Sequence, residues 1–456
     1  MSNNDWISIL NLQPPDMNFR LHLIFPLDDH VPDEKIADAL LKSLESLHKK
    51  NPILESWVKR SAEGSSIYSF CQPPESDGGN VAILHAAKLH HANVEVPSFE
   101  KLKIGSATLD LLADSDLTPQ PRYAKGIGPH PTFDFRASRI KGGLILCFSI
   151  HHKVLDGTST STIIDKFAQE SLKTSNSTPE AEEVILSRDG MAVPMLELPP
   201  PDNASATTIP PAPYRLLAEP STASDPTDAV CKFFALSAAK IPALKRACTS
   251  PSTPFISTND AVTALITHAV TRARRLSPAQ TPTVGAHFPV NVRAQLAPAL
   301  AASQLGNFVL CARAAVPASQ ALSAGADALG ATAAAVRRAV AGLDARSVTR
   351  VLRWVAAQRD PADAVDWRYA YYGEPGIDYG VVSWANMRVY EAEFGVGARV
   401  RPAFVRVPGD VRFRGSCRVM PRFADGSQEI IMGLSQAEME ALEMDELWRE
   451  WVEFVG

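Results

Sequence analysis

Two adjacent histidines at the end of an apolar run carry the clearest chemical signal in this sequence. Residues 142–150 are typical of a buried strand, and His151 and His152 follow it directly. A neutral imidazole can accept a proton at neutral pH, so a histidine aimed from the end of a strand is a candidate general base. Asp156 stands four residues after His152, and we expect it to fix the turn that aims the ring. We expect Gly157 to adopt a backbone conformation that is closed to other residues.

The elements around this motif predict a mixed α/β half. Residues 21–27 are typical of a strand, and a shorter strand is expected near 66–70. An amphipathic helix is predicted over 33–47, because apolar residues recur at helical spacing between an acidic start and a basic end. The Ser/Thr cluster behind the histidine motif predicts a helix from Ser161 to Leu172.

A change in composition predicts a domain boundary near the middle of the chain. The chain has 456 residues, which is long for a single hydrophobic core. From Lys173 to Asp228 many prolines stand among Ser, Thr and Ala, which favours a semi-rigid linker over regular structure. We therefore predict an N-terminal domain over 1–190, a Pro-rich crossover linker over 191–228 and a C-terminal domain over 229–456.

The alternation of strands and helices recurs loosely in the second half. Strands are predicted over 230–236 and 283–290 and within 377–392 and 400–434, and helices over 240–247, 261–270 and the Ala-rich stretch 318–358. Ser257, Thr258 and Asn259 precede the second of these helices, where they can cap it. We expect the aromatic residues Trp448, Trp451 and Phe454 to lie on a C-terminal amphipathic helix and to join the core.

Composition and charge exclude several classes of function. The net charge of -5 provides no basic surface that would suggest nucleic-acid binding. The six cysteines are scattered without a CxxC pair, which favours reduced thiols over a disulfide or zinc framework, and no metal site is predicted. The N-terminal residues lack the features of a secretory signal, and no apolar run is long enough to span a membrane. We therefore expect a soluble cytoplasmic protein.

The arrangement His-His-x-x-x-Asp-Gly after a strand resembles the signature of the CoA-dependent acyltransferase superfamily. This superfamily includes the BAHD-type O- and N-acyltransferases, chloramphenicol acetyltransferase and the condensation domains of peptide synthetases. Further segments resemble the fungal branch of the BAHD type, the trichothecene acetyltransferases, and they occur in the same order: 257–261, 289–293, 305–307, 383–386 and 390–397. The resemblance therefore extends along most of the chain.

The last of these segments departs from the family pattern Asp-Phe-Gly-Trp-Gly. Glu393 stands where the family has Asp, and Val396 stands where it has Trp, whereas Gly395 is kept. In the family this motif lies away from the reacting atoms. The resemblance therefore implies that Glu393 and Gly395 support the structure around the site, and a plain Gly-rich turn between strands is an equal alternative.

The resemblance implies a fold and a division of roles. It implies two chloramphenicol acetyltransferase-like domains, each a mixed sheet flanked by helices, with a tunnel between them. His152 would act as general base without an acyl-enzyme, and His151 would pack or bond to backbone. Asp156 would turn away from the substrate and pair with Arg293, which would join the two domains, although two unrelated solvated charges are the alternative. Gly157 and Arg293 would thus support the site.

The resemblance indicates less about the oxyanion donor and the CoA contacts. Family members often have a Thr where this sequence has Val382, so the usual hydroxyl is missing. Ser383 or the indole N–H of Trp384 could substitute, and a core tryptophan is the alternative. CoA phosphates bind cations or helix N-termini, which makes Ser257, Thr258 and Asn259 candidate contacts; an ordinary helix cap is the alternative.

We therefore expect acyl transfer, with acetyl favoured, from acyl-CoA to a hydroxyl of a small secondary metabolite. Acyl-CoA is a co-substrate, no permanently bound cofactor is expected, and the protein is expected to be a monomer without nucleic-acid or membrane partners. N-acyl transfer remains open. Three alternatives compete: a condensation-type enzyme with a carrier-bound donor, a cyclising enzyme that uses no CoA, as the missing hydroxyl at Val382 hints, and a non-catalytic binding protein.

Overall fold

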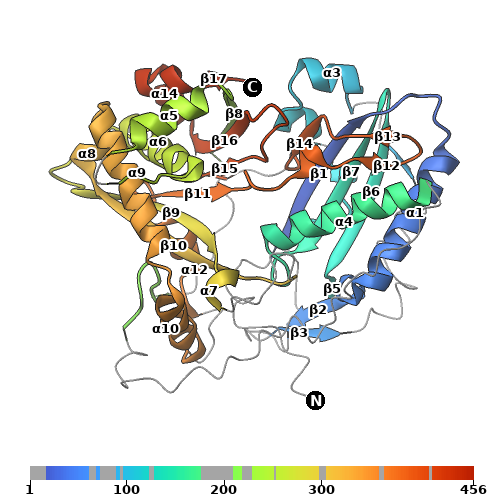
Figure 1. The fold of residues 1–456 in the computed structure, drawn as a ribbon, viewed down its shortest axis with the longest axis horizontal. Coiled ribbons are helices and arrows are strands. Elements are labelled where there is room, and N and C mark those ends of the chain that lie inside the picture. The colour runs from blue at the N-terminus through green and yellow to red at the C-terminus, as the bar shows by residue number, and fades with distance from the viewer. Residues whose placement is uncertain are drawn as a thin grey trace.

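Two separate β-sheets organise the molecule, one in each half (Figure 1). In this computed structural model the described residues are 17–60, 68–71, 89–92, 96–113, 115–122, 128–175, 209–217, 228–250, 253–296, 305–358, 364–409 and 413–456. The mixed α/β class predicted from the sequence is confirmed, with sheets that are flanked by helices in both halves.

The first sheet is built around the strand that leads to the histidines. Its order is β14-β1-β7-β6-β4. The bounds of its strands are β1 Asn18–Pro26, β4 His90–His91, β6 Phe133–Ile140, β7 Gly143–His151 and β14 Phe404–Arg406. All nine residues of β7 are buried, and β7 pairs antiparallel with both β1 and β6. This explains its almost continuous apolar sequence, because a strand covered on both faces needs no polar alternation. A smaller sheet of β2 Trp57–Arg60, β3 Tyr68–Cys71 and β5 His130–Pro131 lies beside it.

Helices cover both faces of the first sheet. Helices α1 Asp33–Lys50 and α4 Gly157–Ser175 pack against each other across one face (Figure 1). The apolar stripe predicted for α1 is the face that it buries: Ile36, Leu40, Leu44 and Leu47. Helix α3, Phe99–Ile104, covers the opposite face over Ile24 and Ile145.

Helix α4 begins at Gly157, four residues earlier than predicted. The cause is Asp156, whose carboxylate accepts a hydrogen bond from the backbone N–H of Ser159 at 2.8 Å and so caps the helix. Gly157 does not belong to the glycines with positive φ, so the expectation of a glycine-only backbone conformation was wrong. The space beside it is limited instead: a Cβ at this position would lie 3.0 Å from Met387 Cε, so that side chain would have to shift.

The second sheet has the order β10-β9-β11-β15-β16-β8-β17. The bounds of its strands are β8 Ala229–Leu236, β9 Thr283–Asn291, β10 Val309–Pro317, β11 Tyr379–Ser383, β15 Ser416–Val419, β16 Gln428–Ser435 and β17 Glu453–Phe454. Strand β11 runs parallel to both β9 and β15, and the remaining pairs are antiparallel. The ends of β9 and β11 therefore lie at the same edge of the sheet.

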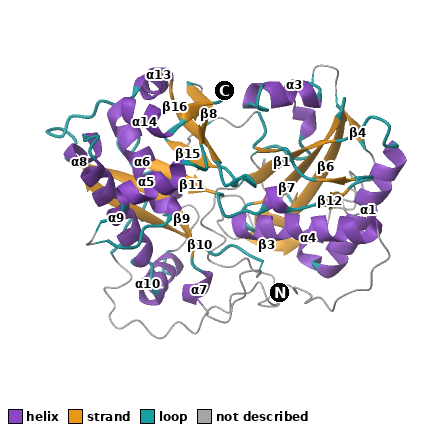
Figure 2. Ribbon diagram, turned by 45° about the horizontal axis from the view of Figure 1, so that its top comes forward, coloured by secondary structure: helices purple, strands orange, loops and turns teal. Residues whose placement is uncertain are grey.

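The two faces of the second sheet carry different helices. Helices α5 Lys240–Cys248, α6 Thr258–Ala273 and α9 Ala326–Ala341 cover one face (Figure 2). Helix α12, Trp367–Tyr372, covers the other, since a Cβ at Gly380 would lie 2.6 Å from the Tyr372 ring. The neighbouring Tyr379 points the opposite way, with its ring under the guanidinium of Arg274, which follows α6. Alternation along β11 thus assigns Val382 to the α12 side.

Several predicted elements of the second half differ in detail. The Ala-rich stretch forms three helices, α8 Ala318–Leu322, α9 and α10 Ala345–Ala356, which are separated by turns that contain Gly325 and Gly342. The C-terminal helix α14, Glu446–Trp451, follows α13, Gln436–Met444, and buries Trp448. Phe454 lies beyond it on β17 and is 59% exposed, so its assignment to the core was wrong.

A segment of the second half returns to the first sheet. After β11 the chain forms β12 Phe394–Gly395, β13 Arg399–Val400 and then β14, which pairs antiparallel with β1 (Figure 1). Residues 404–406 are thus an edge strand of the sheet that carries the histidines. The exact domain bounds stay a prediction, and residues 191–208 and 218–227 of the predicted linker lie outside the described residues.

The described part of the predicted linker, 209–217, runs against α12. The backbone N–H of Cys311 donates to the Tyr214 hydroxyl at 2.8 Å, and Arg215 Nε donates to the Asp366 carboxylate at 2.9 Å. The Arg215 guanidinium lies 3.7 Å from the centre of the Tyr369 ring. The crossover segment therefore holds α12 against the sheet.

The six cysteines are all free, as the sequence predicted. Over the described ranges, no helix combines the length and the apolar character that a membrane crossing requires.

Candidate active site

The histidine motif forms a tight turn whose backbone is held from several directions. The N–H of His152 donates to the Met17 carbonyl at 2.8 Å, and the His152 carbonyl accepts from the Asn307 side-chain amide at 2.8 Å. His151 ends β7, is 1% exposed and packs its ring 6.1 Å from that of His130. The predicted packing position for His151 is therefore found, and only the second histidine reaches the cavity described below.

The ring of His152 is largely withdrawn from solvent. Burial lowers its pKa below the ordinary histidine value, while the carbonyl groups of His152 and Leu155 and the charge of Asp156 oppose that shift. Its Nδ1 atom is buried, and the Phe19 ring lies edge-on at 6.1 Å. The lowered pKa keeps the imidazole neutral, which is the form that accepts a proton.

Asp156 is turned away from the cavity and accepts four hydrogen bonds. Its two oxygens accept from Arg293 Nη1 and Nη2 at 2.8 and 3.1 Å. They also accept from the backbone N–H groups of Ser159 and Phe308 at 2.8 and 2.9 Å. The carboxylate is 1% exposed and Arg293 3% exposed. The predicted pair therefore forms, and it joins the turn in the first half to a helix of the second half, α7 Arg293–Leu296.

Two further segments of the second half complete this junction. Ser159 Oγ donates to the Gly306 carbonyl at 2.7 Å and accepts from the Gly306 N–H at 3.0 Å. The φ of Gly306 is +140°, a conformation that side chains rarely allow. The Asn291 side-chain oxygen accepts from the Arg293 N–H at 3.0 Å. These contacts give the 289–293 and 305–307 segments a shared position at the histidine turn.

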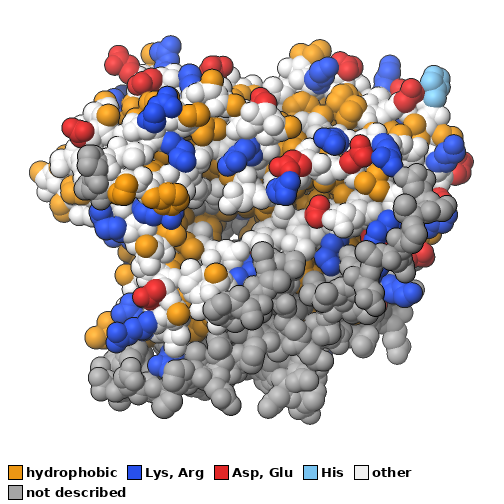
Figure 3. All heavy atoms as spheres, in the orientation of Figure 1, with side chains coloured by type: hydrophobic (Ala, Val, Ile, Leu, Met, Phe, Trp, Pro, Cys, Tyr) orange, Lys and Arg blue, Asp and Glu red, His pale blue; other side chains and the backbone are white. Residues whose placement is uncertain are grey.

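A cavity of about 1080 Å³ lies between the two halves at this turn. It is lined from the first half by residues that include Phe19, His152 and Thr158, and from the second half by the ends of β9 and β11. Figure 3 shows the surface indented between the two halves. The predicted tunnel therefore corresponds to a cavity with His152 in its wall.

The cavity has two distinct walls in the second half. We define the α6 wall as the lining residues on the α6 and α9 side: Ser257, Asn259, Asp260, Phe288, Val290, Arg337 and Val340. We define the α12 wall as those on the α12 side: Pro289, Val309, Tyr371, Tyr372, Val382 and Arg418. Residues that pair across β9, β10, β11 and β15 share a face, which assigns Val309 and Arg418 to this wall.

Trp384 lies beside the histidine at the end of β11. Its ring packs edge-on against Phe19 at 4.9 Å, and Phe19 in turn contacts the His152 ring. The indole nitrogen lies 3.9 Å from the position that a Cβ on Gly157 would take. The Ser383 hydroxyl accepts a hydrogen bond from the Ala385 N–H at 3.4 Å. That bond leaves the Ser383 O–H free to donate, so the contact with Phe19 beside His152 is what distinguishes Trp384.

The candidate CoA residues lie at the N-terminus of α6. The Ser257 hydroxyl accepts from the Asp260 N–H, and the Asp260 carboxylate accepts from the Ser257 N–H, which is a capping box. Ser257 and Asn259 line the cavity, whereas Thr258 is not among the lining residues. The Asn259 side-chain oxygen is buried and has no hydrogen-bond partner among the described residues, so it can accept a bond from a ligand.

Glu393 and Gly395 lie away from the histidine. The N–H of Gly395 donates to the Ser171 hydroxyl at 2.8 Å, near the C-terminal end of α4, and Glu393 accepts from Arg399 at 3.4 Å. Ser171 stands fourteen residues beyond Gly157, which is about 21 Å along a helix. Val396, where the family has Trp, is fully buried. Residues 393–396 therefore secure β12 against α4 and are not among the lining residues of the cavity.

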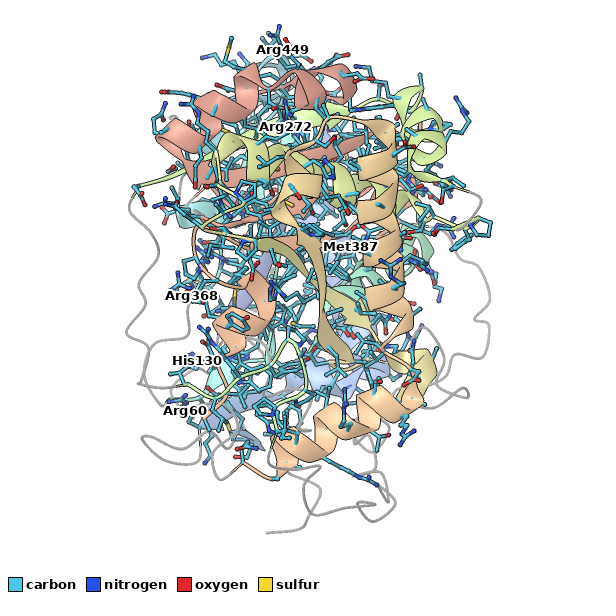
Figure 4. The ribbon with its side chains drawn as sticks, turned by 90° about the vertical axis from the view of Figure 1, so that its left-hand side faces the viewer. Arg60, His130, Arg272, Arg368, Met387 and Arg449 are labelled. Carbon is cyan, nitrogen blue, oxygen red and sulfur yellow. The ribbon has the colours of Figure 1, made fainter. Side chains whose placement is uncertain are left out.

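Phe19, Ser159 and Met387 belong to the site but carried no chemical signal in the sequence. Phe19 lies between His152 and Trp384, Ser159 joins the turn to Gly306, and Met387 packs against Gly157. Figure 4 labels Met387 near the middle of the molecule. Only Ser159 had a usable cue, because a hydroxyl residue just inside a helix start often bonds to backbone.

Comparison with known proteins identifies similar sequences of known type. The model of the Transferase family matches residues 87–447. The chain is 26% identical over 473 residues to trichothecene 3-O-acetyltransferase TRI101 of Fusarium sporotrichioides, covering 99% of this chain and 97% of that protein. It is 26% identical over 381 residues to O-acyltransferase pigD of Monascus ruber, covering 81% of each.

A solved structure has the same fold along the whole chain. The crystal structure of F. graminearum TRI101, complexed with Coenzyme A and T-2 mycotoxin, superposes with a TM-score of 0.80 at 19% sequence identity. The match covers 99% of both chains. The two-domain architecture implied by the sequence resemblance is therefore confirmed.

Proposed function

The chain belongs to the Transferase family, and on this premise we propose that it moves an acyl group from acyl-CoA to a hydroxyl of a small secondary metabolite. Its fungal relatives are named O-acyltransferases and O-acetyltransferases, which makes acetyl the favoured acyl group. The observation that carries the proposal is the placement of His152 in the cavity wall, with a turn that both halves hold in place.

The proposed chemistry is direct transfer with His152 as general base. Because Nδ1 is buried whereas the ring lines the cavity, we assign Nε2 as the basic nitrogen of the neutral ring. Nε2 takes the proton from the acceptor hydroxyl while its oxygen attacks the thioester carbonyl carbon. The tetrahedral intermediate then collapses, the C–S bond breaks, and the CoA thiolate takes the proton from the imidazolium. No acyl-enzyme is required.

Asp156 supports this chemistry without exchanging protons. All of its hydrogen bonds come from Arg293 and two backbone N–H groups, so the carboxylate has no free position for a substrate proton. Its negative charge also favours the imidazolium that forms during transfer. Asp156, Gly157 and Arg293 are therefore proposed as positioning residues.

We propose that the indole N–H of Trp384 stabilises the oxyanion. Val382 provides no hydroxyl in the cavity wall, whereas the Trp384 ring packs against Phe19, which contacts the His152 ring. An N–H that is fixed near the reacting carbonyl before reaction is the kind of donor that stabilises a tetrahedral intermediate. The α6 wall is proposed to bind CoA through Ser257 and Asn259, which leaves the α12 wall for the acceptor.

The first test is calorimetric binding of acetyl-CoA to the wild type and to His152→Ala. We expect micromolar affinity in both proteins and transfer only in the wild type, because His152 acts in chemistry rather than in holding the donor. Absence of acyl-CoA binding to the wild type would refute the proposal. The carrier-dependent and CoA-free alternatives would then be tested with a carrier-bound acyl donor and with acceptor alone.

Thr258, which lies outside the cavity lining, is retained only as a helix-start residue of α6. The monomeric state and the cytoplasmic location stay predictions from the sequence.

A further inference from the structure

The charged residues of the cavity are not evenly paired. Over the described part of the chain, five arginines and three carboxylates line it: Arg20, Arg122, Arg337, Arg388, Arg418, Asp165, Asp260 and Glu391. Arg337 donates to Asp260 at 2.9 Å, and Arg388 pairs with Glu391. These two pairs lie on α9, α6 and the turn after β11, away from the α12 wall.

Arg418 differs from these paired arginines. It lies on β15, directly beside Val382 of β11. Its Nη1 donates to the Ser416 hydroxyl at 3.1 Å and to the Cys417 carbonyl at 3.0 Å. The guanidinium lies 4.5 Å from the centre of the Phe413 ring, and no carboxylate of the described chain is within 4.0 Å of it. Arg418 therefore has N–H groups to offer and a positive charge without an acidic partner.

The residues around Arg418 favour the binding of an anion at its guanidinium. The α12 wall contains no carboxylate, and its other members are apolar or tyrosine side chains. Burial raises the pKa of Tyr371 well above the ordinary value, so its hydroxyl stays neutral. In such a wall a partly buried guanidinium is poorly solvated, and a carboxylate that binds in fork geometry compensates for that loss.

We propose that the acceptor carries an anionic oxygen group, of which a carboxylate is the simplest case, and that Arg418 binds this group. The inference rests on the proposed acyl transfer and names the class of its acceptor. The anion of the acceptor is favoured over a CoA phosphate, because Arg418 points from the α12 face of the sheet. The candidate CoA residues at the start of α6 lie over the opposite face.

The test compares hydroxy acids with their uncharged methyl esters. Salicylate, p-coumarate and lithocholate, each with its ester, are titrated by calorimetry into protein saturated with CoA, so that no transfer occurs. We expect at least one acid to bind wild type about 10- to 100-fold more tightly than its ester, the range for a hydrogen-bonded charge pair. In Arg418→Gln this preference disappears, while CoA affinity is unchanged.

Two control variants separate the local effect from a loss of fold or charge. Arg418→Lys keeps the charge but lacks the planar fork, and should retain part of the preference. Arg449→Gln removes the same charge from exposed α14, at the top of Figure 4, and should retain all of it.

Three results would overturn the assignment of Arg418. The acids bind no better than their esters, or not at all at millimolar concentration; the preference persists in Arg418→Gln; or Arg418→Gln weakens CoA binding instead. Failure of the wild type to bind CoA would refute the proposed function. The acid and ester titration on CoA-free protein would still test Arg418 alone.

Discussion

Removing the ion pair between Asp156 and Arg293 should destabilise the protein strongly, and the two single changes should not add. The perturbations are Asp156→Ala, Arg293→Met and the double variant. Asp156→Ala removes the acceptor of four hydrogen bonds and leaves a guanidinium that is 3% exposed without its counter-charge. Loss of one partner from a buried pair costs about 3–5 kcal/mol.

The double variant should be about as stable as either single variant. It leaves no unpaired charge, although the N–H groups of Ser159 and Phe308 still lose their acceptor. We therefore expect a coupling free energy of about 3–5 kcal/mol between the two positions, the size of one single effect. In Asp156→Ala, Arg293 can keep its hydrogen bonds to the Ser159 hydroxyl at 3.0 Å and to the Gly306 carbonyl at 3.3 Å. These two bonds limit the loss of stability in that variant.

The measurement is urea unfolding, followed by circular dichroism and by tryptophan fluorescence. If the two probes give different unfolding midpoints, the double-mutant cycle is calculated from the first unfolding transition. The matched control is Asp445→Ala, which breaks the 2.6 Å pair with Arg272 inside the second half. It should lower stability but leave kcat unchanged, whereas Asp156→Ala should lower kcat by about 100-fold because the histidine turn shifts.

Two results would contradict this reasoning. Effects that add within about 0.5 kcal/mol would show that the pair is not coupled. Loss of activity in Asp156→Ala with unchanged stability would assign Asp156 a direct part in the chemistry.

Three further predictions concern single groups. Neutral His152 is the active base and burial lowers its pKa, so kcat/KM should stay level as pH falls through 6.5 and decline only at lower pH; a decline centred above 6.5 would contradict this. Trp384→Phe removes the proposed oxyanion donor and should lower kcat about 100-fold without raising the KM for acetyl-CoA; full activity would assign the donor elsewhere. Ser171→Ala removes the bond from Gly395 and should cost about 1 kcal/mol in thermal unfolding at unchanged kcat, whereas a loss of kcat would connect β12 to the chemistry.

Local pattern was enough to predict the elements that bury a regular apolar face. The stripe of α1 and the apolar run of β7 gave their type and position, because periodicity reports directly on burial. The predicted start of α4 is wrong by four residues, because Asp156 caps the helix and the Ser/Thr cluster does not. Helix propensity predicts one continuous helix over the Ala-rich stretch, and propensity alone does not reveal the breaks at Gly325 and Gly342.

The site residues also divide into those that local spacing reveals and those that depend on contacts between distant parts of the chain. His152 and Asp156 were visible because their spacing is a local property of one turn. The pairing with Arg293 came from family resemblance, since 137 residues separate the partners and no local pattern encodes that contact. Phe19, Met387 and Arg418 reach the cavity through tertiary contacts between strands that are distant in sequence, which a single sequence does not specify.

The return of β14 to the first sheet has a consequence for biosynthesis. Strand β1 pairs on one side with β7, and at its other edge His22, Leu23 and Ile24 pair with residues 404–406. An unpaired apolar edge is a template for pairing with another chain. The ribosome reaches β14 roughly 250 residues after β7, a delay on the order of ten seconds to a minute at roughly 5–20 residues per second. The half that bears the proposed base is thus translated first, but its sheet stays incomplete until residues 404–406 emerge, and we expect the nascent chain to need a chaperone during that interval.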